Sequence, residues 1–221
     1  NKMILKNLIK KSWVDFKDTL PSFLKTVWWL LLILIAIPHV SSYFEVDESS
    51  WLDLFLSFGE GIVIMFLSIY SFVCLFQSRN IEISLSGGKI FIFWFASAFI
   101  SIASSIATLF LVIPGLMILA LSIFVPIFIL FKNQGPIEAI ASSSFNMEDQ
   151  FIKLTAVFTL LWGIPMIIEY GLVYLSLNIL LYEITSVSFA ALFGYFIYSV
   201  AFNAYFELDK IHNKSMQPSA D

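Results

Sequence analysis

The sequence predicts an all-α membrane protein with six transmembrane helices and two interfacial amphipathic helices on the cytoplasmic side. Apolar residues make up 59% of the 221-residue chain and charged residues 13%, about half the charged share of a soluble protein. In addition, the segment 90–131 contains no Lys, Arg, His, Asp or Glu. As one helix it would be about 63 Å long, about twice the thickness of a bilayer's hydrocarbon core, so we expect it to cross twice.

The first segment, 1–21, has the pattern of a basic amphipathic helix that lies in the membrane interface. Its apolar residues recur at helical spacing, and Lys6, Lys10 and Lys11 accompany Trp13. Lysines on such a helix face anionic headgroups, and a tryptophan sits at headgroup level. A signal peptide is the competing interpretation. It is disfavoured because the charged part is long and contains two aspartates, and because the next apolar run is long enough to span a bilayer.

Four transmembrane helices are expected in the next part of the chain, 22–131. Their predicted ranges are about 22–44, 54–76, 90–113 and 116–131. The last two form a helical hairpin that reverses at Pro114 and Gly115. Proline removes a backbone donor and glycine permits unusual dihedral angles, so this pair favours a tight reversal.

The cytoplasmic segment 132–153 is expected to hold the second interfacial helix. Pro136 is suited to the first turn of a helix, and Ile137, Ile140 and Phe145 then recur at helical spacing. Helices five and six follow within 154–206, at about 154–178 and 186–206, and the cytoplasmic tail 207–221 is polar. The chain is thus expected to form a single polytopic membrane domain, 1–221.

The distribution of charge predicts the topology. Every Lys and Arg falls in the N-terminal segment, in 77–89, in 132–153, in the tail, or at Lys25 near the start of the first transmembrane helix. The two remaining polar segments contain acids alone: one holds Glu45, Asp47, Glu48 and Asp53, and the other Glu183. Because positive loops stay in the cytoplasm, both termini are expected there. Six crossings satisfy this arrangement, and five or seven do not.

One stretch resembles a known bacterial pattern. Ile113-Pro114-Gly115 is followed by an apolar helix, by Gly135-Pro136-Ile137-Glu138-Ala139-Ile140, and by Ser144-Phe145. This order resembles the YciC-type family of uncharacterised six-helix inner-membrane proteins. More distantly, it is similar to the membrane domain of some glycerophosphodiester phosphodiesterases. The resemblance implies a location in a bacterial inner membrane and no established activity.

Two carboxylates lie inside predicted spans. An ionised acid within a bilayer is costly, so it usually faces the bundle interior or water and marks a pathway. Glu60 and Glu169 fit this description, and one hypothesis is a shared cation or proton site between their helices. The alternative is that each acid bonds to a neighbouring helix or reaches the outer headgroups.

The sequence contains no motif for enzymatic chemistry. Its two histidines and single cysteine are far apart, so no zinc site is predicted, and no phosphate-binding loop occurs. We expect no cofactor, no metal, no nucleic-acid partner and no catalytic activity. The favoured function is a membrane-integrity or assembly module that binds lipid or a membrane partner. The alternative is a small transporter or channel that uses Glu60 and Glu169.

Overall fold

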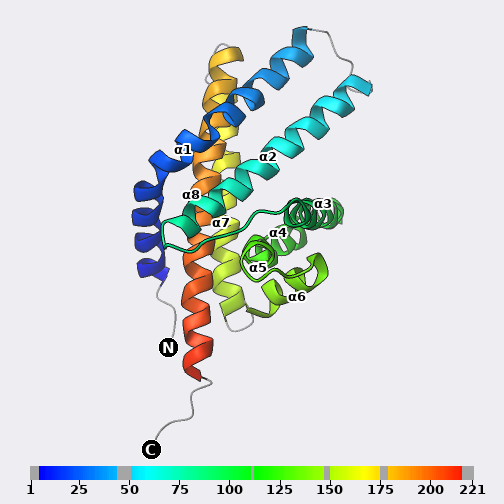
Figure 1. The fold of residues 1–221 in the computed structure, drawn as a ribbon. Helices are drawn as coiled ribbons and strands as arrows, with labels where there is room; N and C mark the ends of the chain where they lie inside the picture. The colour runs from blue at the N-terminus through cyan, green and yellow to red at the C-terminus, as the bar shows by residue number, and fades with distance from the viewer. Residues whose placement is uncertain (1–4, 44–50, 111, 147–149, 175–178, 216–221) are drawn as a thin grey trace, which may run out of the picture.

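A computed structural model describes residues 5–43, 51–110, 112–146, 150–174 and 179–215. Within these ranges the regular elements are helices, drawn in Figure 1. They are α1 (Leu5–Tyr43), α2 (Trp51–Gln77), α3 (Gly87–Phe110), α4 (Val112–Leu121), α5 (Val125–Leu130), α6 (Pro136–Asn146), α7 (Phe151–Tyr174) and α8 (Ile179–Ser215). The acids predicted for the first outer segment, except Asp53, lie outside the described residues.

Four of the described helices are long and apolar enough to cross a membrane. Their apolar stretches are Leu5–Val40, Trp51–Gln77, Gly87–Phe110 and Leu181–Lys210. Two shorter apolar stretches, Met117–Leu130 and Ile152–Pro165, fall in α4–α5 and in α7. An all-helical membrane protein is therefore what the described part of the chain supports.

Helix α8 is the centre of the arrangement. It contacts α1, α2 and α7, and the N-terminal part of α1 runs beside its C-terminal part in Figure 1. Helices α7 and α8 run up the picture, whereas α3 and α4 are seen end-on. The α3–α4 hairpin therefore crosses α7 and α8 steeply, and the six apolar segments do not form one parallel bundle.

The N-terminal helix differs from its predicted boundary at residue 21. Helix α1 continues from Leu5 to Tyr43 with Pro21 and Pro38 inside it, so the expected interfacial helix and first transmembrane helix are one element. A proline removes one backbone bond and kinks a helix without ending it when the flanking turns are packed. Figure 1 shows α1 bending between its lower and upper parts.

The helix predicted over 116–131 is broken in the structure. Helix α4 ends at Leu121, and α5 begins at Val125 with Pro126 in its first turn. The pyrrolidine ring of a proline clashes with the carbonyl four residues earlier, so the break precedes it. Ser143 of α6 bridges the break, because its Oγ donates to the Leu121 carbonyl and accepts from the Phe124 N–H at 3.2 Å.

Pro114 and Gly115, predicted to form the reversal between the two helices, lie inside α4 instead. Helix α3 ends at Phe110 and α4 begins at Val112, so both residues lie in the first turns of α4. A proline is tolerated there because its missing N–H has no partner in that turn. Gly115 is buried against α3, and its carbonyl accepts a bond from Ser104 Oγ at 3.0 Å.

The predicted tail 207–221 begins as a continuation of α8. The helix extends to Ser215, and Leu208 is buried. Glu207 lies 3.6 Å from Lys210 one turn later. Such pairs support an extended helix end.

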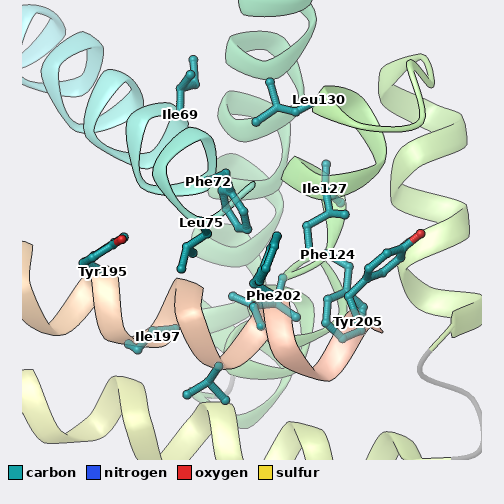
Figure 2. Close-up of a cluster of buried hydrophobic side chains, with 14 of the residues drawn as sticks. Ile69, Phe72, Leu75, Phe124, Ile127, Leu130, Tyr195, Ile197, Phe202 and Tyr205 are labelled. Carbon is teal, nitrogen blue, oxygen red and sulfur yellow. The ribbon is translucent and has the colours of Figure 1, made fainter. Parts of the chain in front are cut away.

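The hydrophobic core lies where α2, α5 and α8 meet. Figure 2 shows Phe72 of α2, Phe124 and Ile127 of the α5 region, and Phe202 and Tyr205 of α8 directed into one cluster. Phe124 and Phe128 pack edge-to-face against Tyr205, at centroid distances of 6.1 and 5.5 Å. Aromatic pairs of this kind add about 0.5–1.5 kcal/mol each beyond the area they bury. The short α5 is thereby held inside the protein.

Candidate functional site

A basic face runs along the N-terminal part of α1. Lys6, Lys10, Trp13 and Lys17 are all exposed, and their spacing of four, three and four residues places them in one stripe. The Lys17 ammonium lies 5.9 Å from the centre of the Trp13 ring. Trp13, which is 49% exposed, also stacks on Phe16 at 5.4 Å. We call these four exposed residues the basic face.

Lys11 belongs to a different face of the same helix. Its Nζ donates to Glu207 Oε1 of α8 at 3.3 Å. The structure thus separates the four residues predicted for membrane binding: Lys6, Lys10 and Trp13 lie in the exposed stripe, while Lys11 is engaged with the neighbouring helix. Both side chains of this ion pair are more than a third exposed, so it adds little stability.

A polar network that the sequence analysis missed joins α1, α8 and the end of α2. Arg79, the chain's single arginine, donates to Asp15 Oδ2 at 3.1 Å and to Asn203 Oδ1 at 2.6 Å. Asn203 Nδ2 in turn donates to the same Asp15 oxygen at 2.8 Å. The three side chains close a ring of hydrogen bonds, and this ring fixes the position of α1 against α8.

Aromatic rings cover the guanidinium of Arg79. Its central carbon lies 4.8 Å from the Phe202 ring centre and 5.0 Å from that of Phe206. Cation–π contacts contribute about 0.5–2 kcal/mol, more where water is excluded. Asn203, a polar residue inside a predicted span, was the signal from which this network could have been found.

Two further hydrogen bonds join α1 to α8. Together with the ring of Asp15, Arg79 and Asn203 they form what we call the polar seam. Ser199 Oγ donates to the Ser12 carbonyl at 2.9 Å, and the Tyr195 hydroxyl donates to Thr19 Oγ1. Phe23 stacks on Tyr195 at a centroid distance of 4.0 Å. Residues 5–23 of α1 are therefore held along one side of α8, which leaves the basic face directed outward.

The opposite ends of α1 and α8 meet in a separate contact between a histidine and a glutamate. His39 Nε2 lies 2.7 Å from Glu183 Oε2. Lys11, Arg79 and Glu207 gather at the other end of α8. The basic segments and Glu183, the acid predicted to face outward, thus lie at different ends of the same helix pair.

Helix α6 presents apolar side chains outward. Ala139 and Ser143 are buried against the α4–α5 region, whereas Ile137 is 81% and Phe145 is 69% exposed. An apolar stripe on the outer side of an amphipathic helix is suited to the boundary between headgroups and acyl chains.

Glu60 lines a cavity between α1, α2 and α8. This cavity has a volume of about 330 Å³, and its walls include Phe23, Ile64, Tyr195 and Tyr198. The side chain of Glu169 on α7 lies outside the described part of the structure, so the expected meeting of the two acids stays a prediction. Helices α2 and α7 both contact α8.

A second cavity lies on the other side of α2, against α3 and α5. Its volume is about 540 Å³, and its lining includes Ser57, Ser101 and Trp162. Ser68 and Tyr198 line both cavities, and their hydroxyl oxygens are 2.7 Å apart. Ile64 also lines both cavities, so this hydrogen bond is one part of the boundary between the two spaces.

The described residues include no group of three or more His, Cys, Asp or Glu side chains placed to hold a metal ion. The arrangement combines an exposed basic face, the hydrogen-bonded polar seam between α1 and α8, and two cavities among apolar helices. Comparison with protein families, with curated proteins and with solved structures yields no match for this chain.

Proposed function

We propose that this protein is a non-enzymatic membrane-integrity or assembly module of a bacterial inner membrane, which binds anionic lipid through the basic face. The single observation that carries the proposal is the exposed stripe of Lys6, Lys10, Trp13 and Lys17. Each lysine near an anionic surface contributes about 1 kcal/mol. Three such residues on one helix, with a tryptophan between them, form a lipid-binding surface.

The polar seam supports this role because it prevents the basic face from turning inward. Ser12 and Asp15 are bonded to α8 and Arg79, so the opposite side of α1 must face away from the protein. The exposed Ile137 and Phe145 of α6 supply a second surface for the membrane interface. Besides lipid, the exposed surfaces of α1 and α6 are suited to a partner protein in the membrane.

The proposal includes six crossings with both termini in the cytoplasm, and it requires the α3–α4 hairpin to tilt toward the direction of α7 and α8 in the membrane, away from the steep crossing in Figure 1. Lys89 Nζ donates to the Leu130 carbonyl at 3.3 Å, so the start of α3 and the end of α5 lie together, as two ends on one side of the membrane should. Single cysteines introduced at Lys89, Lys132 and Trp51, labelled in intact cells with a membrane-impermeant maleimide, test this topology. Labelling at Trp51 alone is expected, and labelling at Lys132 would contradict six crossings.

Lipid binding is tested on the purified full chain by native mass spectrometry. We expect retained phosphatidylglycerol to exceed phosphatidylcholine, and the triple variant Lys6→Gln, Lys10→Gln, Lys17→Gln to lose this preference. The matched control removes three other lysines: Lys25→Gln, Lys132→Gln and Lys153→Gln. An equal loss in both triple variants would show that total charge, not the basic face, selects the lipid.

The alternative function is a small transporter or channel. The location of Glu60 in a cavity between three helices favours it. If Glu60 and Glu169 form one cation or proton site, Glu60→Gln and Glu169→Gln should each abolish ion flux into proteoliposomes. Unchanged flux in both variants would exclude this mechanism.

A further inference from the structure

The cavity beside Glu60 has an unusual combination of charge and lining. Its volume of about 330 Å³ is within the range of small-ligand sites. Apolar and small residues make up most of its wall, together with several hydroxyl groups, and Glu60 is the one charged residue of the lining among the residues that the structure describes. Within the described residues Glu60 forms no ion pair.

Glu60 is exposed in the structure, and its position along α2 makes a carboxylate without an ion pair costly in a bilayer. It is the tenth residue of α2, which begins at Trp51, so it lies about 14 Å along the helix from that end. An ionised acid at such a depth costs a few kcal/mol in a bilayer. A cation bound beside Glu60 would offset this cost without rearranging the helix.

Aromatic side chains supply a second interaction for a cation. Phe23, Tyr195 and Tyr198 line the cavity. Phe23 and Tyr195 stack on each other and are each 1% exposed, so the partly exposed Tyr198 is the ring with surface left for a ligand. Aromatic faces attract organic cations, most strongly when water is excluded. The remaining wall, including Leu34 and Val187, is suited to hydrocarbon.

We propose that this cavity binds a cationic amphiphile, a ligand with one ammonium group beside Glu60 and an apolar body against Tyr198, Ile64 and Val187. A zwitterionic phospholipid fits less well, because the described part of the lining contains no basic side chain to pair with its phosphate. This site is separate from the basic face, which selects the opposite charge, so the inference goes beyond the proposed lipid binding and does not depend on it.

The probe is 4-phenylbutylammonium, titrated calorimetrically into the full chain in a neutral detergent, with 4-phenylbutanol as the uncharged probe of the same shape. We expect the ammonium to bind at least tenfold more tightly than the alcohol. Glu60→Gln should remove that tenfold preference. Glu82→Gln, which removes an exposed acid of the α2–α3 connection outside the cavity, should leave it unchanged.

A steric pair of variants tests the location independently of charge. Gly194 lines the cavity, and a Cβ added there meets no atom within 4 Å, so Gly194→Leu should fill the space and abolish binding. Gly163 of α7 also has no atom within 4 Å of an added Cβ and lines neither cavity, so Gly163→Leu should bind normally.

Three results would overturn the proposal. These are equal affinity for the ammonium and the alcohol, unchanged binding in Glu60→Gln, or unchanged binding in Gly194→Leu. Displacement of the probe by phosphatidylethanolamine at comparable affinity would also reject a preference for net cationic ligands. None of these results bears on the basic-face triple variant, so the two proposals fail separately.

Discussion

The close approach of α4 to α3 at Gly115 makes a sharp prediction. A Cβ added to Gly115 would overlap Thr108 Oγ1 and would lie 3.0 Å from the Ser104 carbonyl oxygen and 3.1 Å from Thr108 Cβ. Rotation of Thr108 could relieve the first overlap, but it would break the 2.8 Å bond from Thr108 Oγ1 to the Ser104 carbonyl. The backbone oxygen of Ser104 has no such freedom.

The magnitude follows from these two effects. Overpacking costs about 1–3 kcal/mol, and loss of the threonine hydrogen bond costs about 0.5–1.5 kcal/mol. We therefore expect Gly115→Ala to lower the free energy of unfolding by about 2–4 kcal/mol. Adding Thr108→Ala removes the overlapping hydroxyl and should restore part of the loss.

The assay is unfolding by sodium dodecyl sulfate in mixed micelles, followed by tryptophan fluorescence. Gly163→Ala is the control, because an added Cβ there meets no atom within 4 Å. A helical Gly→Ala change without a clash stabilises by about 0.5–1 kcal/mol, so the two variants should shift in opposite directions. If Gly115→Ala had the same free energy of unfolding as the wild type, the close packing of α3 and α4 would be refuted.

Two further predictions concern buried polar contacts. Ser143→Ala should destabilise the protein by about 1–3 kcal/mol, because it leaves the Leu121 carbonyl and the Phe124 N–H without their partner. The control is Ser144→Ala, because the hydroxyl of Ser144 donates to a carbonyl of its own helix. This control should have little effect in the same unfolding assay. Arg79→Lys should cost about 2–3 kcal/mol, since lysine cannot reproduce the planar fork and its aromatic stacking. Lys11→Gln, which removes an exposed ion pair, should cost less than about 1 kcal/mol. Equal losses in Arg79→Lys and Lys11→Gln would contradict the network.

The sequence predicted the helical class because uninterrupted apolar runs leave few alternatives in a bilayer. It did not predict the break between α4 and α5, although Pro126 marks it. The run around Pro126 is uniformly apolar, and the group that satisfies the freed backbone atoms, Ser143, is 22 residues away from Leu121. A local pattern contains no information about such a partner.

The candidate site was predicted only in part for the same reason. The spacing of Lys6, Lys10 and Trp13 is local, and the structure places these three residues in one exposed stripe. The engagement of Lys11 with Glu207 spans 196 residues, and that of Arg79 with Asn203 spans 124. Neither pair could be assigned without the packing of α1 and of the end of α2 on α8.

The ring of Asp15, Arg79 and Asn203 has a consequence for biosynthesis. Asn203 follows Asp15 by 188 residues, which takes about 10–40 s to synthesise at about 5–20 residues per second. Throughout that interval the buried side of α1, including Leu8 and Phe16, lacks the helix that covers it. Helix α1 is therefore synthesised long before α8, the helix that covers its buried side.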